Sequence, residues 1–347
     1  MPVGYFFVNS PLQYLCALEA SYVFGEELDK VKLIVLNTSN PSLRQLKSII
    51  DKNIWNDIIL EIRLAGDHKI NIIRGINKLL RVFSNKFIVM KYLYEIKKED
   101  YIFIGNLNDD IYAFLLEKAK CSHKVVLDDG FATLSYIKNN LKLGTVSYNP
   151  IKAVQLVQKI LMPPKKIKLE SLVFFSMYNK IDFQSARCNY NDFKYVREAF
   201  GMSCYEKDQL VLFIGQPLVA VNAISEKFYT KIVNSIQLYY ENQGFEFEYC
   251  AHRGEDISIL PVKWNIKIYN YPIEVELLKR RILPDTVISI SSSALISIKI
   301  IFEERIKVVA VNPFSETSSN YLDDIYEYIQ KEAGPTLVVR ECGFYCN

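Results

Sequence analysis

The sequence has few of the residues that build metal centres and disulfide frameworks. Three of its 347 residues are histidines, and because they form no HxH or HxxxH pair, a zinc site of the common kinds is not expected. Its seven cysteines are scattered, odd in number and without a CxxC pair, which favours reduced thiols in a cytoplasmic protein. We therefore expect neither a metal ion nor a disulfide framework.

An excess of one charge and a long hydrophobic run are also missing. Lys and Arg number 42 against 39 Asp and Glu, a net charge of +3 that gives no general basis for binding nucleic acid. The longest apolar stretch, 286–302, is interrupted by serines and by Lys299, so it does not predict a membrane span. Because the first residues lack the basic segment of a signal peptide, we expect a cytoplasmic protein.

What the sequence does contain is apolar segments of strand length that alternate with segments of helical spacing. Hydrophobic residues make up 50% of the chain, which is ample for packed cores. Strands are predicted at 31–37, 57–64, 100–106 and 124–130, each followed by a helical segment, and the alternation resumes at residue 208. The pattern predicts an α/β protein with two Rossmann-like domains that face a cleft.

A change of composition near the middle of the chain marks the predicted domain boundary. Pro163 and Pro164 follow a helical segment and precede a basic run, a pattern typical of a connector. We predict an N-terminal domain over 1–165, a linker region over 166–207 and a C-terminal domain over 208–347.

Three features leave the surroundings of the protein open. The basic run could be a solvated connector or a peripheral contact with the anionic inner face of the cell membrane; it consists of Lys165, Lys166 and Lys168. Segment 69–87 predicts a helix with a basic face. The last predicted helix, 320–333, could cross back to the first domain or pack on the partner subunit of a homodimer, and the sequence does not decide between them.

Short polar loops follow most of the predicted strands. Since ligands bind at the carboxyl ends of the strands in open parallel sheets, these loops are where chemistry is expected. They are NSPLQ (9–13), GNLND (105–109), DDG (128–130), GQP (215–217), AHRGE (251–255), YPIE (271–274) and SSS (291–293).

Two of these loops carry groups suited to proton transfer and to anion binding. A carboxylate of DDG, Asp128 or Asp129, could take a proton from a hydroxyl group, although Asp-Gly is also a common turn. Serines at the start of a helix place hydroxyl and backbone N–H donors where a phosphate can bind, although Ser291 or Ser292 could simply cap the helix. Each loop therefore has a functional and an ordinary structural interpretation.

The loops AHRGE and YPIE also have two interpretations each. His252 could stabilise charge on a leaving phosphate and Arg253 would add permanent positive charge, yet a lone histidine is more often structural and a turn arginine is more often solvated. Glu274 could accept hydrogen bonds from ribose hydroxyls, or it could be a favourable acidic residue in a first helical turn.

The order of these motifs resembles that of bacterial sialyltransferases of glycosyltransferase family 52 and, more distantly, that of bacterial polysialyltransferases. The motifs are DDG, FIGQPL, HR-E, P-x-E and the serine run. The resemblance implies a two-domain GT-B glycosyltransferase that moves sialic acid from CMP-sialic acid to a bacterial surface glycan, lipooligosaccharide or capsule, without a metal or other cofactor. One departure is HRGE at 252–255, where the family usually has His-Pro-Arg-Glu.

The resemblance also implies roles for individual residues. Asp129 would be the general base, with Asp128 as the neighbouring candidate, and His252 would assist the departure of CMP. The residues implied in binding the donor, on the C-terminal domain, are Gly215, Gln216, Pro217, Arg253, Glu274, Ser291, Ser292 and Ser293. The residues expected on the acceptor side, in the N-terminal domain, are Asn9, Ser10, Gln13 and Asn106.

Three other functions remain open from the sequence. The donor could be a related nonulosonic acid linked to CMP. A sugar-nucleotide epimerase uses the same architecture, with acidic residues and a histidine in its cleft, but handles UDP-sugars. The altered histidine loop also leaves room for an inactive protein that only binds a glycan or a nucleotide-sugar.

Overall fold

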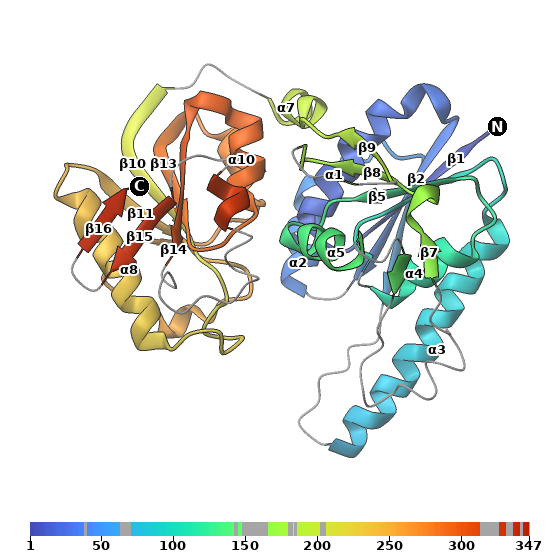
Figure 1. Ribbon diagram of the computed structural model, residues 1–347, viewed down its shortest axis with the longest axis horizontal. Helices are drawn as coiled ribbons and strands as arrows, with labels where there is room; N and C mark the ends of the chain where they lie inside the picture. Colours follow the sequence, from blue (N-terminus) through green and yellow to red (C-terminus); the bar gives the residue numbers. More distant parts are fainter. Residues whose placement is uncertain are drawn as a thin grey trace. The chain divides into compact units, whose positions relative to one another are not determined.

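The chain folds into two compact units, Met1–Val196 and Arg197–Asn347 (Figure 1). The computed structural model describes residues 1–37, 40–62, 71–107, 109–141, 145–147, 166–179, 183, 186–201, 206–312, 326–330, 336–340 and 343–346. In the part of the chain so described, no helix is long and apolar enough to cross a membrane.

The first unit is built on a seven-stranded parallel sheet. Its strands are β1 (Val3–Val8), β2 (Lys30–Asn37), β3 (Asp57–Ile62), β4 (Tyr101–Ile104), β5 (His123–Leu127), β8 (Val173–Ser176) and β9 (Arg187–Tyr190). They lie in the order β3-β2-β1-β4-β5-β8-β9, and every neighbouring pair is parallel. The order reverses between β1 and β4, and in open sheets of this kind ligands bind at such a reversal.

Helices connect the strands of the first unit. They are α1 (Pro11–Val23), η1 (Gly25–Glu27), α2 (Asn40–Ile49), α3 (Asn71–Glu95), α4 (Asp110–Lys118), α5 (Phe131–Leu141), η2 (Leu169–Ser171) and α7 (Lys194–Phe200), which ends in the second unit. A short antiparallel pair joins β6 (Thr145–Ser147) to β7 (Lys166–Lys168). Ser10 caps α1 by accepting the N–H of Gln13, and Asp109 caps α4 by accepting the N–H of Ile111.

Aromatic side chains fill much of the first core. Phe6 of β1 stacks on Phe103 of β4 with ring centroids 4.0 Å apart. Phe7, on the opposite face of β1, meets Tyr92 of α3 edge to face at 5.0 Å. All four rings are fully buried, and burial of each large apolar side chain contributes about 1.5–3 kcal/mol. These rings hold β1 and β4, the two strands on either side of the reversal, in a rigid core.

The second unit repeats the same strand order. Its sheet runs β12-β11-β10-β13-β14-β15-β16, parallel except for the last pair. The strands are β10 (Glu206–Ile214), β11 (Glu246–Cys250), β12 (Ile266–Lys267), β13 (Ile282–Ser289), β14 (Lys307–Asn312), β15 (Thr336–Arg340) and β16 (Gly343–Cys346). The helices are α8 (Glu226–Glu241), η3 (Ile257–Ile259), α9 (Ile273–Lys279), α10 (Ala294–Phe302) and η4 (Glu303–Arg305). Here the order reverses between β10 and β13.

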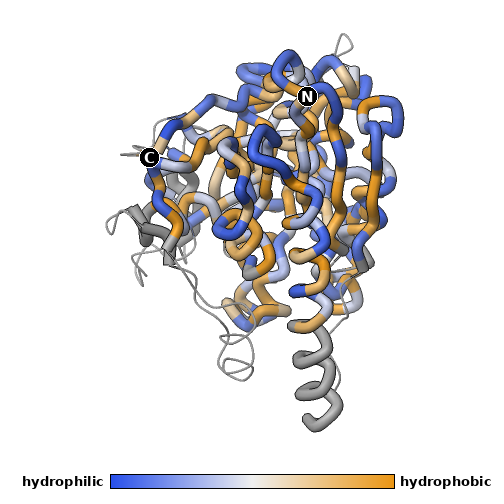
Figure 2. The backbone as a smooth tube through the Cα atoms, turned by 90° about the vertical axis from the view of Figure 1, so that its right-hand side faces the viewer, coloured by the Kyte–Doolittle hydropathy of each residue, from blue (hydrophilic) through white to orange (hydrophobic). Residues whose placement is uncertain are grey.

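The predicted pair of Rossmann-like α/β domains is confirmed, and much of the apolar sequence lies on the strands (Figure 2). The predicted linker over 166–207 differs from the structure. Residues 166–196 belong to the first unit, where β8 and β9 complete the sheet. The sequence did not predict these two strands because β8 is too short and β9 too exposed to give a clear apolar pattern. Lys165 lies outside the described residues, and β7 includes Lys166 and Lys168. Of the predicted helix at 320–333, residues 326–330 are described and helical, and its contact with another domain or subunit stays a prediction.

Candidate active site

Asp129 lies directly beyond the carboxyl end of β5 and is held by two side-chain amides. Gln13 donates its Nε2–H to Oδ1 of Asp129 at 2.7 Å, and Asn106 donates its Nδ2–H to Oδ2 at 2.5 Å. The backbone N–H of Asp129 donates to the hydroxyl of Thr133 at 2.8 Å. Gly130 follows with a φ of 61°, which a residue with a side chain rarely adopts, and the chain turns there into α5. The carboxylate is thus oriented from both sides while its residue stays partly exposed.

The two amides come from the loops after β1 and β4, on either side of the strand reversal. Gln13 is fully buried in the first turn of α1, and its Oε1 accepts the backbone N–H of Asn9 at 2.8 Å. Its other end therefore presents Nε2 to Asp129. Gly105 allows this arrangement, since a Cβ there would lie 2.3 Å from the amide of Gln13. The structure thus brings the loops of four predicted acceptor-side residues together with the predicted base: Asn9, Ser10, Gln13 and Asn106.

Asp128 has different surroundings from Asp129, and its role as a second catalytic candidate stays a prediction. Its side chain is fully buried, and it accepts the hydroxyl of Ser176 at 2.8 Å and the backbone N–H of Met177 at 2.6 Å. Burial raises the pKa of Asp128 to about 7, against the opposing effect of these hydrogen bonds. Adjacent residues in extended chain point to opposite sides, so one carboxylate holds the end of β8 while the other faces the loops.

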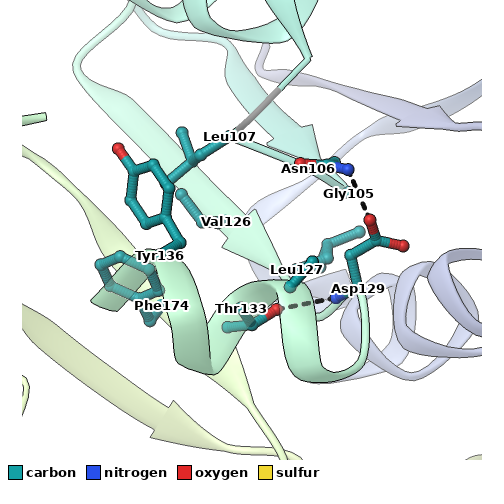
Figure 3. A pocket seen from close by; sticks show the side chains of 10 residues that line it. Gly105, Asn106, Leu107, Val126, Leu127, Asp129, Thr133, Tyr136 and Phe174 are labelled. Atoms are coloured by element: carbon teal, nitrogen blue, oxygen red, sulfur yellow. Dashed lines mark hydrogen bonds between the residues drawn. The ribbon is translucent and has the colours of Figure 1, made fainter. Parts of the chain in front are cut away.

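A small pocket lies beside Asp129. Figure 3 shows the Asp129 carboxylate turned toward Asn106, with the rings of Tyr136 and Phe174 on the far side of the pocket. The cavity is about 10 Å³, which suits about one water molecule and is too small for a sugar ring. A larger ligand that reached Asp129 would therefore bind on the exposed side of the carboxylate.

In the second unit, Gln216 joins the loops that follow β10 and β13. Its Oε1 accepts the backbone N–H of Ser291 at 2.8 Å and the Ser291 hydroxyl at 3.3 Å. Ser292 and Ser293 then lead into α10, where the Ser292 hydroxyl accepts the N–H of Ala294. Within the described residues no protein acceptor takes the backbone N–H of Ser292 or Ser293. These amides at a helix N-terminus are suited to hold an anion.

His252 is held as a neutral ring with its proton on Nε2. The backbone N–H of Gly254 donates to Nδ1 at 3.0 Å, so Nδ1 carries no proton and Nε2 becomes the donor. Burial, and then the positive charge of Arg253, lower the pKa of His252 to about 4. Arg253 and Gly254 stand where the family that the sequence resembles usually has Pro and Arg, and here the backbone of Gly254 orients the histidine. His252 is therefore a hydrogen-bond donor without a charge of its own.

Sequence reasoning missed the residue that organises this loop, Glu255. It accepts the hydroxyl of Tyr249 at 2.6 Å and the backbone N–H of His252 at 2.6 Å, while Tyr229 donates to it at 3.3 Å. Burial raises the pKa of Glu255, opposed by the hydrogen bonds from Tyr249 and His252. At Gly215 a Cβ would lie 2.4 Å from Glu255 and 2.5 Å from Tyr249. The one signal in the sequence was that Glu255 lies three residues after His252, close enough to accept a hydrogen bond from its backbone.

Glu274 and Arg253 differ in exposure. Glu274, in the first turn of α9, is 5% exposed and accepts the hydroxyl of Ser297 of α10 at 2.7 Å. Burial raises the pKa of Glu274, against the effects of Ser297 and of the positive charge of Arg253. Arg253 itself is exposed.

Pro217 follows Gln216 in the loop after β10. The predicted donor-side residues therefore lie at one end of the second sheet.

Comparison with solved structures identifies the fold. Os79 from O. sativa, solved in complex with U2F and trichothecene, has a TM-score of 0.52 and 10% identity, over 99% of this chain and 88% of that chain. A UDP-glucosyltransferase from Polygonum tinctorium gives 0.50 and 9%, over 99% and 86%. A Photobacterium sp. 2,6-sialyltransferase, solved with CMP and lactose, gives 0.48 and 13%, over 95% and 76%. No protein-family model and no curated protein matches this sequence.

This chain has the GT-B glycosyltransferase fold. The assignment rests on the first two structures and on the two sheets of reversed strand order. At these identities the likeness extends to the fold and leaves the substrate to be argued from the residues. Among the residues that the structure describes, no group of three or more His, Cys, Asp and Glu side chains is placed to hold a metal ion.

Proposed function

We propose that this protein is an inverting sialyltransferase that moves sialic acid from CMP-sialic acid to a hydroxyl of a bacterial surface glycan. The observation that carries the proposal is the orientation of Asp129 by Gln13 and Asn106 at the strand reversal of the first unit. Two amide donors on one carboxylate hold a base in a fixed direction beside the loops expected to meet the acceptor. The CMP-linked donor is inferred from the resemblance of the motif order to family 52.

The proposed reaction is a single displacement. Asp129 takes the proton of the acceptor hydroxyl, whose oxygen forms a bond to the anomeric carbon of sialic acid. The bond from that carbon to the phosphate oxygen breaks, and CMP leaves with the electron pair. One displacement inverts the configuration at the anomeric carbon, and the transition state has oxocarbenium character.

The second unit would stabilise the phosphate of the departing CMP. The Nε2–H of His252 and the backbone N–H groups of Ser292 and Ser293 are donors suited to the oxygens of a phosphate. Glu274 and the segment Gly215–Pro217 would border the ribose and the base. In this proposal no metal ion takes part, because these donors meet the negative charge.

CMP release from CMP-sialic acid, measured with and without a galactose-terminated acceptor, tests the proposal. Release that the acceptor stimulates, and that Asp129→Asn and His252→Ala both abolish, is the expected result. Turnover of UDP-N-acetylglucosamine without release of CMP would instead favour an epimerase. Binding of CMP without any turnover would point to another CMP-nonulosonate or to an inactive binder.

A further inference from the structure

Helix α3 buries only one of its faces in the first unit. Ile88, Val89 and Tyr92 are at most 4% exposed, and they belong to the core that also contains residues of α4. With 25 residues α3 spans about 37 Å, at about 1.5 Å per residue. The helix therefore has a long second face that this core does not cover.

That second face carries a stripe of large apolar side chains. Phe83 is 51% exposed, Phe87 74%, Met90 51% and Tyr94 93%. The spacing i, i+4, i+7, i+11 places all four on one narrow side of the helix. No other helix among the described residues exposes more than two large hydrophobic side chains, so the stripe on α3 is distinctive. Water-exposed apolar surface of this kind marks a site that binds another surface.

The sequence continues the same spacing toward the start of the helix. Three apolar residues each lie seven positions before another one of the series: Ile73 before Leu80, Ile76 before Phe83, and Leu80 before Phe87. Seven apolar positions thus recur in the sequence between residues 73 and 94. The exposed side chains from Phe83 to Tyr94 suit an extended partner surface better than a single small pocket.

The charge of this segment indicates the chemistry of the partner. Residues 68–94 contain no Asp or Glu, and their basic residues are Lys69, Arg74, Lys78, Arg81, Lys86 and Lys91. Of these, Lys91 pairs with Glu61 of β3 at 2.7 Å. A helix with one apolar side and an excess of basic residues is the form that binds the interface of an anionic membrane.

A second copy of the chain is the competing occupant, and charge disfavours it. In the seven-residue repeat, Lys86 and Lys91 lie on the two flanks of the apolar stripe. Two such helices packed stripe against stripe would bring basic flanks together, whether parallel or antiparallel. An anionic lipid surface would attract Lys86, whereas the charge of Lys91 is already met by Glu61.

We propose that α3 is a membrane-docking helix, which inserts Phe83, Phe87, Met90 and Tyr94 between the headgroups of an anionic lipid surface. This differs from the contact predicted at Lys165, Lys166 and Lys168, because it places the contact on a structured helix with apolar side chains. It does not depend on the proposed reaction, since binding to lipid can be measured without any substrate.

Co-sedimentation of the full chain with vesicles tests the proposal. The protein should bind vesicles of phosphatidylcholine with phosphatidylglycerol and should not bind vesicles of phosphatidylcholine alone. Phe87→Ser with Met90→Ser should lower the partition coefficient by about tenfold or more, through loss of the buried apolar area. Arg81→Glu with Lys86→Glu should lower it as well, and added salt should weaken binding by the unchanged protein.

The matched controls lie on α8 of the second unit. Phe228→Ser with Leu238→Ser removes two exposed apolar side chains, and Lys227→Glu with Lys231→Glu makes the same change of net charge. Neither pair should alter binding. Equal loss in test and control pairs, or no binding of the unchanged protein to anionic vesicles, would overturn the proposal. Self-association that Phe87→Ser and Met90→Ser abolish, without vesicle binding, would assign the stripe to a second copy instead.

Discussion

At the scale of single residues, two adjacent carboxylates have different surroundings. Asp129 receives two side-chain amides at the edge of the sheet, whereas Asp128 is fully buried and holds the end of β8. The same side-chain chemistry is therefore assigned to proton transfer in one residue and to stability in the next. Substitution of each by its uncharged isostere separates these roles.

Asp129→Asn should lower kcat by about 10²–10⁴-fold, the range typical of a lost general base, and should leave the free energy of unfolding nearly unchanged. Asp128→Asn should instead cost about 1–3 kcal/mol of stability, because the new amide N–H₂ meets the N–H of Met177 or the hydroxyl of Ser176 in a buried site. Initial rates of CMP release and urea unfolding measure the two effects. A kcat loss of equal size in both variants, with both folded, would contradict the separation.

His252 should make stability depend on pH in the acidic range. Its folded pKa, about 4, lies below its ordinary value of about 6.5, so between these pH values the unfolded chain binds a proton that the folded protein does not. Stability contributed by the neutral ring is therefore lost as the pH falls through this window. From pH 7 to pH 5 the natural protein should lose about 2 kcal/mol more than His252→Gln, measured by urea unfolding. Identical losses would show that His252 titrates normally.

At the scale of elements, the glycines of the strand-end loops make room for the side chains that organise the site. A Cβ on Gly215 would overlap Glu255 and Tyr249, which hold the His252 loop. Gly215→Ala should therefore weaken CMP binding by about tenfold, measured by titration calorimetry. The added methyl group would shift Glu255 and with it the His252 loop, so that the His252 donor no longer meets the phosphate. Gly25→Ala is the control, since nothing lies within 4 Å of a Cβ there, and it should bind CMP normally.

The elements also show what the sequence could and could not predict. Strands such as β1 and β10 were predictable because long apolar runs are visible locally, and the loops after them were placed correctly at the carboxyl ends. Strand β9 was not, because all four of its residues are exposed at the edge of the sheet. The direction of the Asp128 side chain depends on Met177, which is distant in the sequence. The role of Glu255 depends on Tyr249, which lies outside the loop motif 251–255. Such contacts are set by packing and have no local pattern.

At the scale of the whole molecule, the two units have separate cores, and each contains one of the two tryptophans. Trp55 packs on Phe6 in the first unit, and Trp264 stacks on Tyr249 in the second, each 4% exposed. Separate cores permit separate unfolding transitions. Trp55→Phe and Trp264→Phe would each leave a single fluorophore that reports on one unit.

CMP should then stabilise the second unit selectively. A ligand present at about 100 times its dissociation constant adds about 2.7 kcal/mol to the unit that binds it. With CMP, the thermal transition reported by Trp264 should shift upward, while that reported by Trp55 should stay within error, because the proposed donors all belong to the second unit. Uridine, which lacks the phosphate, is the control and should shift neither transition. A shift of Trp55 alone would place the nucleotide in the first unit, and the assignment of Ser292, Ser293 and His252 to the phosphate would then be wrong.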